Sequence, residues 1–404
     1  MCTIRSTAAR RAARPTRGSA IRTRGAVAVL MILALAACHG GRSGPARTGD
    51  AGSPVDCAAG LPLATIKLPP GFAICAYATK VPGARSLALG RRGTVFVGTS
   101  GDRVFALPAA EGRHRADRVV AVASGLRAPA GVAFRNSDLY IAEDPRVLRM
   151  DDVERRIDAP PPPAVVRGDL PSGGPGGERV IAFGPGGWLY VAVGAPCDAC
   201  EPRDPRSASI VRMKTDGSQL EIYARGVRRS LGLDWEPVTG VLWFTDAARE
   251  PSGDAAPSDE LNRAPAKGLH FGFPYCRGGA IPDPAFRAKR SCDEFVPPAL
   301  AFGPRAGAAG LRFYAGTMFP PEYRGRIFVA GRGGAGRGAP AGSGVTAVTL
   351  QGDRPVAAEP FAEGWLQNGD SWGRPVDVLV MPDGALLVSD EKAGAVYRIS
   401  YQGQ

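Results

Sequence analysis

Cysteines are the residues of this sequence whose spacing points most directly to a chemistry. Beyond residue 38 there are six, at positions 57, 75, 197, 200, 276 and 292. In an exported chain an even number of cysteines predicts disulfides, and six cysteines allow fifteen pairings. We expect Cys276 to pair with Cys292 and Cys197 with Cys200, which leaves Cys57 for Cys75. The CxxC spacing at 197–200 also suits a redox or zinc motif, but a second metal-binding pair is lacking.

Histidine, the commonest general base, is scarce in this chain. The three histidines are His39, His114 within the turn Arg113-His114-Arg115, and His270. For His270 we expect a packing or loop role. A Gly-x-Ser-x-Gly elbow is also missing, so a protease or esterase is not supported.

The first 37 residues read as an export signal. Residues 1–25 contain seven arginines and no acid, and an apolar run over 26–34 follows them. A basic region before a short apolar core is typical of a secretory signal. The run ends in Leu35-Ala36-Ala37-Cys38, which resembles a lipobox, so we expect Cys38 to be lipidated. The alternative is a plain signal peptide in which Cys38 is incidental.

Composition and charge exclude several classes of protein. The chain has 404 residues, of which 44% are hydrophobic, so a disordered chain or a small disulfide scaffold does not fit. Its 54 glycines and 37 prolines favour many short strands joined by turns. The net charge of +12 falls to +5 when residues 1–37 are removed. Because no basic face with interleaved aromatics remains, we expect no nucleic-acid partner and a membrane link through the lipid anchor only.

A strand theme recurs along the chain and predicts the fold. Six copies of paired apolar strands with an alternation of period two begin near residues 87, 132, 181, 232, 311 and 377. Such four-stranded units bury their faces when they stack around an axis. The sequence therefore predicts an all-β protein, a six-bladed β-propeller with loop insertions. We expect a signal peptide over 1–37, a flexible tether over 38–60 and the propeller over 61–404. A pair of β-sandwiches is the structural alternative.

Several short sequence motifs fall on these predicted blades, in order along the chain. They are Gly226-Val227-Arg228-Arg229-Ser230-Leu231-Gly232-Leu233-Asp234-Trp235, Asp259-Glu260-Leu261-Asn262-Arg263, Phe319-Pro320-Pro321-Glu322-Tyr323 and Gly373-Arg374-Pro375-Val376-Asp377. In these motifs the chain resembles the soluble quinoprotein glucose and sorbosone dehydrogenases, and the resemblance covers roughly residues 60–402. Those enzymes use pyrroloquinoline quinone (PQQ) and calcium.

The resemblance implies a cofactor site. Arg228, Arg337 and Arg374 match family arginines and would meet the three carboxylates of PQQ, since guanidinium forks suit carboxylates. Asp259 and Glu260 stand where the family has acidic residues near a structural calcium site, and oxygen ligands suit Ca²⁺. A solvated turn is the alternative for these two acids.

The chain departs from the family pattern at the general base. Where the family has His-His-Gly, this chain has Pro175-Gly176-Gly177, so no catalytic residue is assigned. Arg229 replaces an asparagine, and the run that begins at Arg332 replaces a segment with histidine and tryptophan. Losing a general base typically costs a factor of ~10²–10⁴ in rate. Two functions remain: a periplasmic PQQ-dependent dehydrogenase of sugars or aldehydes with weak turnover, or a lipid-anchored propeller that binds a carbohydrate or protein partner without catalysis.

Overall fold

The structure is a computed structural model that describes residues 57–174, 177–249, 258–333 and 343–403. In these ranges the elements are strands and short 3₁₀ helices, namely η1 (Leu63–Thr65), η2 (Val153–Arg155), η3 (Pro185–Gly187), η4 (Cys292–Glu294) and η5 (Pro321–Tyr323). The described part of the chain contains no helix long and apolar enough to cross a membrane.

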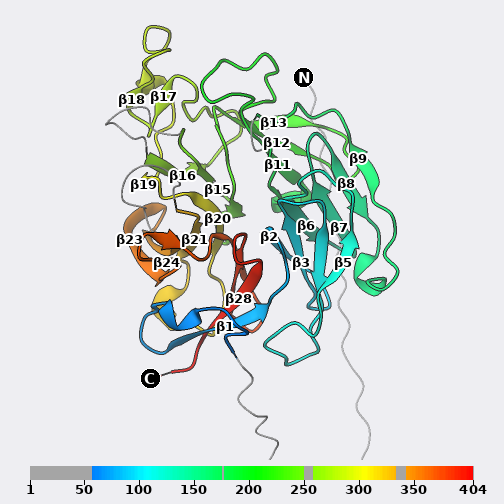
Figure 1. The fold of residues 1–404 in the computed structure, drawn as a ribbon. Helices are drawn as coiled ribbons and strands as arrows, with labels where there is room; N and C mark the ends of the chain where they lie inside the picture. The colour runs from blue at the N-terminus through cyan, green and yellow to red at the C-terminus, as the bar shows by residue number, and fades with distance from the viewer. Residues whose placement is uncertain (1–56, 175–176, 250–257, 334–342, 404) are drawn as a thin grey trace, which may run out of the picture. The chain divides into compact units, whose positions relative to one another are not determined.

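Six antiparallel four-stranded sheets make up the described chain (Figure 1). The first three are β2 (Ala84–Leu89), β3 (Val95–Thr99), β4 (Val104–Leu107), β5 (Val120–Ala123); β6 (Gly131–Arg135), β7 (Asp138–Ala142), β8 (Val147–Met150), β9 (Ala164–Arg167); and β10 (Ile181–Phe183), β11 (Leu189–Val193), β12 (Ser209–Met213), β13 (Glu221–Arg225). The other three are β14 (Leu233–Trp235), β15 (Leu242–Asp246), β16 (Ser258–Ala264), β19 (Leu300–Pro304); β20 (Ala308–Phe313), β21 (Ile327–Gly331), β22 (Gly344–Gln351), β23 (Arg354–Glu363); and β26 (Pro375–Val380), β27 (Leu386–Asp390), β28 (Ala395–Tyr401), β1 (Phe72–Ala78).

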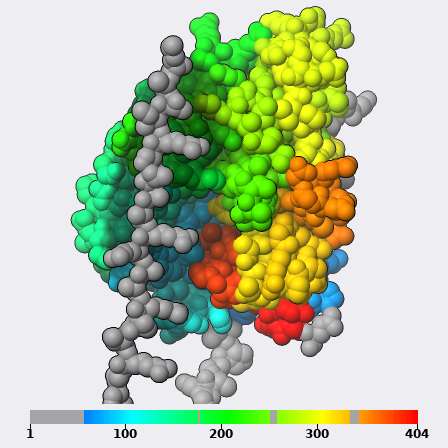
Figure 2. Space-filling view, turned by 180° about the vertical axis from the view of Figure 1, so that it is seen from behind, coloured from blue at the N-terminus to red at the C-terminus, as the bar shows by residue number. Residues whose placement is uncertain are grey.

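The first strand of each sheet lies innermost, and these inner strands form a closed ring. Strand β2 contacts β6 and β26, and the series continues through β10, β14 and β20 back to β26. In the view from behind (Figure 2) the colour passes from cyan through green to yellow and orange around the molecule, so successive sheets are neighbours. This arrangement confirms the predicted six-bladed propeller, and each predicted copy coincides with one sheet.

The sixth sheet is completed from the other end of the chain. Strand β1 pairs with β28 in antiparallel register, with Phe72 opposite Tyr401, and the two lie side by side in Figure 1. This pairing joins the beginning and the end of the folded region. Without β1, the backbone N–H and C=O groups along the outer edge of β28 would have no strand partner.

Apolar side chains pack mainly between neighbouring sheets. Phe96 of the first sheet stacks on Phe134 of the second, and Phe72 meets Phe319 and Phe361 edge to face. Backbones approach closely where the inner strands meet: a Cβ added to Gly232 would lie 2.5 Å from the carbonyl oxygen of Ala309. Apolar burial between sheets thus supplies the packing that none of the sheets has alone.

Two small hairpins and three disulfides complete the described fold. Hairpin β17 (Cys276–Arg277) with β18 (Ile281–Pro282) lies in the insertion between β16 and β19, and hairpin β24 (Leu366–Gln367) with β25 (Asp370–Ser371) precedes β26. The disulfides are Cys57–Cys75, Cys197–Cys200 and Cys276–Cys292. All three expected pairings are therefore confirmed.

Candidate functional site

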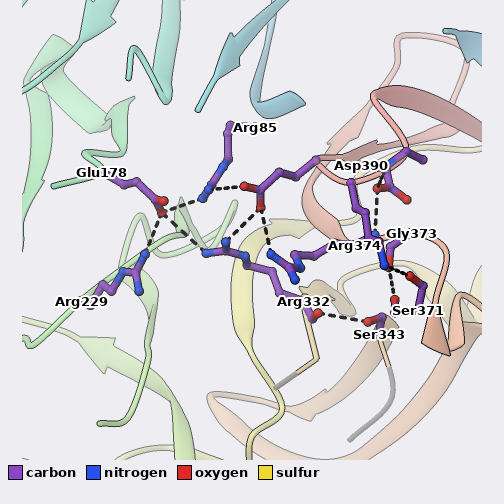
Figure 3. Close-up of polar contacts among 12 residues, drawn as sticks. Arg85, Glu178, Arg229, Arg332, Ser343, Ser371, Gly373, Arg374 and Asp390 are labelled. Carbon is purple, nitrogen blue, oxygen red and sulfur yellow. Dashed lines mark hydrogen bonds and ion pairs between the residues drawn. The ribbon is translucent and has the colours of Figure 1, made fainter. Parts of the chain in front are cut away.

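Charged side chains gather at one end of the ring of inner strands. Within a sheet, the loop that enters the first strand and the loop that leaves the second lie at the same end, because these strands are antiparallel. We call this end the mouth. Side chains from five sheets meet there (Figure 3), and we call them the charged cluster: Arg85, Glu178, Arg229, Arg332, Arg374 and Glu391.

Four members of the charged cluster form a ring of ion pairs, which we call the Arg–Glu ring. Arg85 donates to Glu178 and to Glu391, both at 2.6 Å. Arg332 lies opposite, 2.9 Å from Glu391 and 3.6 Å from Glu178. Each guanidinium group thus touches both carboxylates, so the Arg–Glu ring as a whole is neutral.

The Arg–Glu ring is largely withdrawn from water. The exposed fraction of the Arg85 side chain is 5%, and those of Glu178 and Glu391 are 11% and 16%. Burial alone would raise the pKa of Glu178, but the guanidinium groups of Arg85, Arg229 and Arg332 outweigh it and hold this pKa below its ordinary value. Glu178 is therefore ionised beside the arginines at neutral pH, and it is a weak proton acceptor.

Arg229 and Arg374 lie outside the Arg–Glu ring and are more exposed. Arg229 donates through Nη2 to Glu178 at 2.9 Å, with 34% of its side chain exposed. Arg374 stands 3.9 Å from Glu391, with 40% exposed. In Figure 3 they are seen on opposite sides of the ring. With four arginines and two glutamates, the charged cluster carries a net charge of +2.

In the fourth and the sixth sheets, an aspartate at the end of the sheet's second strand fixes the backbone of these outer arginines. Asp246, the last residue of β15, accepts the backbone N–H groups of Arg228 and Arg229 at 2.8 and 2.6 Å. Asp390, the last residue of β27, accepts the N–H of Arg374 at 2.8 Å and the Tyr397 hydroxyl at 2.8 Å. The same device in two sheets sets where the arginine side chains begin.

The predicted cofactor arginines are found in different surroundings. Arg374 belongs to the charged cluster. Arg228 instead turns toward Asp198, 2.6 Å away, and also donates to the carbonyl oxygens of Ala247 and Ala248 at 3.1 and 3.0 Å. Arg337 lies outside the described residues. The geometry thus places one predicted arginine in the cluster and binds another to loop groups beside it.

The predicted metal ligands lie in β16, beside Asp246 of the neighbouring strand. The carboxylate of Asp259 accepts backbone N–H groups from Ala248 and Ala308, at 2.8 and 3.1 Å, and from Gly307. Burial, then the carboxylate of Asp246, raises the pKa of Glu260 to about 8, and burial raises the pKa of Asp246 to about 7. Among the residues that the structure describes, no group of three or more His, Cys, Asp or Glu could hold a metal ion.

Neither described histidine belongs to the charged cluster. His270 lies in the insertion after β16, where its ring meets that of Phe295 at 4.6 Å and its Nδ1 accepts the N–H of Gly272. Burial, then Arg290, lowers the pKa of His270 to about 4, so it is neutral at physiological pH. These contacts are those of a packed loop residue, as expected. His114 is exposed, and Gly176 and His39 lie outside the described residues.

A cavity opens next to the charged cluster. It encloses about 620 Å³, including space open to solvent. Its walls include Glu178, Arg228 and Arg229, the disulfide-bonded Cys197, and small residues at 173, 174, 177, 194 and 195. The glycines leave open space beside the guanidinium groups of Arg228 and Arg229.

Sequence reasoning did not assign Arg85, Glu178, Arg229, Arg332 or Glu391 to the site. Arg229 and Arg332 stood out only as departures from a family pattern. Four of them share one feature of sequence position. Glu178 and Arg229 lie within four residues before the first strand of a sheet, and Arg332 and Glu391 directly follow a second strand. Their mutual contacts come from five sheets and could not be read from local sequence.

Six four-stranded sheets in a ring, with guanidinium groups gathered at one end, define an all-β propeller. The family model for glucose/sorbosone dehydrogenases matches residues 168–398. The chain therefore belongs to the glucose/sorbosone dehydrogenase family.

Two individual proteins are similar to this chain in sequence. An uncharacterized protein of Borreliella burgdorferi is 26% identical over 353 residues, which cover 84% of this chain and 91% of the relative. An aldose sugar dehydrogenase of Escherichia coli is 25% identical over 251 residues, 57% of this chain and 61% of that enzyme.

Solved structures share the fold at lower identity. The holo PQQ domain of a pyranose dehydrogenase from Coprinopsis cinerea aligns with a TM-score of 0.70 at 14% identity, covering 83% of this chain and 97% of that one. The PQQ-bound aldose sugar dehydrogenase of Streptomyces coelicolor aligns with a TM-score of 0.60 at 20% identity, covering 83% and 99%.

Proposed function

We propose that this chain is a PQQ-dependent dehydrogenase of aldoses or sorbosone-type aldehydes, with the cofactor held at the mouth and with slow turnover. The observation that carries the proposal is the charged cluster, in which Arg229 and Arg374 remain 34% and 40% exposed. When bound, PQQ supplies a quinone that accepts hydride from the anomeric carbon of a sugar.

The chemistry of the donor set fits the cofactor. PQQ carries three carboxylates, and guanidinium groups bind carboxylates through paired, charge-assisted hydrogen bonds. Arg229 and Arg374 would bind and orient it, and the buried Arg–Glu ring would form the floor beneath it. The cavity beside Arg229 would admit the sugar.

Proton transfer is the weak step of this proposal. The described histidines lie outside the charged cluster, and the pKa of Glu178 is held low by three arginines. A group with a low pKa is a poor general base near neutral pH. Slow oxidation of sugars is therefore expected.

A test of this function uses the purified full-length protein in detergent, mixed with PQQ and Ca²⁺. We expect a shifted quinone absorbance and slow bleaching of a redox dye when glucose or another aldose is added. Gly176→His should raise the rate without changing PQQ affinity, if only the base is missing. An intact fold that neither shifts the absorbance nor bleaches the dye contradicts the cofactor assignment.

A binding protein without catalysis is the second candidate. Two observations favour it. The described histidines lie outside the charged cluster, and four of the six charged groups in that cluster already neutralise one another in the Arg–Glu ring. PQQ binding with no dye reduction, even in Gly176→His, would support this candidate, with a carbohydrate or protein as its partner.

The calcium site at Asp259 and Glu260 remains a proposal. Asp259 already accepts three backbone N–H groups, one from the loop after β15 and two from the start of β20, so an ion would share its oxygens with these groups. Chelation of Ca²⁺ should lower PQQ affinity if the site exists. No change in affinity or thermal stability on chelation would contradict it.

Export and lipid anchoring through Cys38 are also proposals. Three disulfides in the described chain support an oxidising compartment such as the periplasm. Cys38→Ala should release the protein from the membrane fraction. Retention of that variant in the membrane would show that Cys38 is not the anchor.

A further inference from the structure

The CxxC pair lies in the loop that leaves the second strand of the third sheet. This loop spans residues 194–208, between β11 and β12, and therefore lies at the mouth. Its Cys197 and Cys200 form a disulfide across a separation of three residues. We propose that this disulfide is a redox latch: a dithiol reductant opens it, and its opening releases the loop from Arg228 and Arg249. Neither PQQ nor sugar oxidation takes part in this step.

The two ends of this loop are fixed by backbone hydrogen bonds, but its middle is not. At one end the N–H of Ala195 donates to the carbonyl oxygen of Arg228 at 2.8 Å. At the other end the N–H of Ala208 donates to the carbonyl oxygen of Gly194 at 3.3 Å. Residues 196–203 form no backbone-to-backbone hydrogen bond with any residue that the structure describes. A segment of this kind opens locally at low cost unless something else holds it.

Asp198, which lies between the two cysteines, connects the loop to two arginines. Its Oδ1 accepts a hydrogen bond from Nη2 of Arg228 at 2.6 Å, and its backbone oxygen accepts one from Nε of Arg228 at 3.3 Å. Its Oδ2 lies 3.2 Å from Nε of Arg249. Because 53% of the Asp198 side chain is exposed, these ion pairs contribute little unless the carboxylate is held in place. The short ring that the disulfide closes holds it there.

Glu201, directly after Cys200, joins the same loop to the insertion between β16 and β19. Its carboxylate accepts hydrogen bonds from the hydroxyl group of Tyr275 at 2.9 Å and from Nζ of Lys289 at 2.6 Å. The side chains of Glu201 and Lys289 are 43% and 53% exposed, so this pair is also weak by itself. The position of the loop therefore depends on the disulfide that closes the ring beside it.

A reductant can reach this disulfide from the cavity beside the charged cluster. Cys197 lines that cavity, whereas Cys200 does not, and both side chains are half-buried. Arg228 and Arg229 line the same space. Positive groups beside a partly exposed cysteine favour its thiolate form and attract an anionic thiolate. Cys197 is therefore the sulfur that the reductant attacks.

The reaction is a thiol–disulfide exchange that transfers two electrons. One thiolate of the dithiol attacks Sγ of Cys197, the bond to Cys200 breaks, and Cys200 leaves as a thiolate that takes up a proton. The second thiol of the reductant, once deprotonated, attacks the reductant sulfur of this mixed disulfide and releases Cys197, which takes up a proton as well. The reductant ends as a cyclic disulfide, and the two protons it has lost balance the two that the cysteines gain.

Opening the latch changes the shape of the mouth. Asp198 and Arg228 line the cavity beside the charged cluster and also a second hollow, which encloses about 440 Å³, including space open to solvent. Phe271 and Phe273 of the insertion line this second hollow. Once Asp198 leaves Arg228, the two spaces become continuous, and the guanidinium group of Arg228 loses its carboxylate partner.

The test follows reduction and loop release in the folded protein. Purified full-length protein in detergent is treated with increasing dithiothreitol, alkylated and mapped by mass spectrometry. We expect Cys197 and Cys200 to be alkylated while circular dichroism still shows the native fold, and before Cys276, which is 8% exposed. In the same samples, trypsin cleavage after the exposed Arg203 should accelerate about tenfold, since cleavage follows the population of the open loop.

Two variants separate the cross-link from the contacts that it positions. Cys197→Ser/Cys200→Ser should be cleaved after Arg203 as fast as the reduced wild type, without any reductant. Asp198→Asn keeps the disulfide and loses the ion pairs, so its cleavage after Arg203 should rise less.

Single substitutions test which sulfur the reductant attacks. Cys200→Ser leaves the thiol of Cys197, which lines the cavity, and Cys197→Ser leaves that of Cys200, which does not. We expect DTNB, an anionic aromatic disulfide, to react about tenfold faster with Cys200→Ser than with Cys197→Ser.

Cys57→Ser/Cys75→Ser is the matched control, because it removes a disulfide at β1 and should leave cleavage after Arg203 unchanged. Equal cleavage after Arg203 in the oxidised wild type, the reduced wild type and Cys197→Ser/Cys200→Ser would overturn the latch. Reduction of the Cys197–Cys200 disulfide only when the protein unfolds would overturn the redox site. Faster reaction of Cys197→Ser than of Cys200→Ser would overturn the route through the cavity.

Discussion

At the scale of single residues, the acids around the mouth do two different jobs. Asp246 and Asp390 accept backbone N–H groups and so place Arg229 and Arg374. Glu178 and Glu391 meet guanidinium groups directly and compensate their charge. Glu260 accepts hydrogen bonds from the Asn262 side chain and from the backbone of Gly278, but the charges that act on it most strongly are the carboxylates of Asp246 and Asp259.

Glu260 therefore predicts a pH-dependent stability. Because its pKa rises to about 8 in the folded chain from an ordinary value of 4.5, its contribution is fully present below about pH 4.5 and is lost as pH rises through 8. Glu260→Gln cannot ionise, so the variant should be more stable than the wild type at pH 9 by up to about 5 kcal/mol and within about 1 kcal/mol of it at pH 5. Urea unfolding at both pH values measures this.

The control for this prediction is Glu221→Gln. The pKa of Glu221 is lowered, first by its hydrogen bond from Lys267, so it stays ionised from pH 6 to 9. Its removal should shift stability by the same amount at both ends of that range. If Glu260→Gln showed the same flat difference, the burial of an ionising carboxyl would not be the cause.

At the scale of elements, the closure of the propeller ring depends on strand β1. It adds an edge strand to β28, and its first residue, Phe72, contacts Phe319, Tyr323, Phe361 and Tyr401 edge to face. These rings come from the fifth and sixth sheets and the loop between β20 and β21. One side chain thus ties the start of the folded region to its last two sheets.

Phe72→Ala should lower the free energy of unfolding by about 2–4 kcal/mol, since it removes a ring that packs against four others. Chemical denaturation followed by tryptophan fluorescence gives the value. Val238→Ala, at a side chain that is 91% exposed, is the control and should change stability by less than about 0.5 kcal/mol. Equal effects of the two substitutions would show that the closing contact is not important.

At the scale of the whole molecule, the ring holds because neighbouring inner strands approach at backbone distance. Gly232, just before β14, faces the Ala309 carbonyl of β20 in the next sheet. A side chain there would push two sheets apart, and a closed ring cannot absorb the shift locally. The position of Arg229, three residues earlier, depends on the same loop.

Gly232→Ala should therefore destabilise the protein by about 1–3 kcal/mol, because the added Cβ would lie 2.5 Å from a backbone oxygen. Gly168→Ala is the matched control, since its added Cβ would meet only a Val165 methyl group at 3.5 Å. The measurement is the thermal unfolding of both variants and of the wild type. A Gly232→Ala variant as stable as the wild type would contradict close contact between the fourth and fifth sheets.

The repeat, the six-bladed ring and the three disulfides of this protein could all be predicted from its amino-acid sequence. Alternating apolar residues and turn-forming glycines specify strands locally, and such strands have few ways to bury both faces. A family motif also predicted Arg374 as a cofactor-binding residue, and Arg374 lies in the charged cluster. The folded chain was needed to show that Arg85, Glu178, Arg332 and Glu391 form one neutral ring, that Arg228 turns to Asp198, and that Arg229 is open. The reason is physical: a pattern of burial repeats every two residues along a strand, whereas an ion pair between sheets depends on side chains hundreds of residues apart, as Arg85 and Glu391 are.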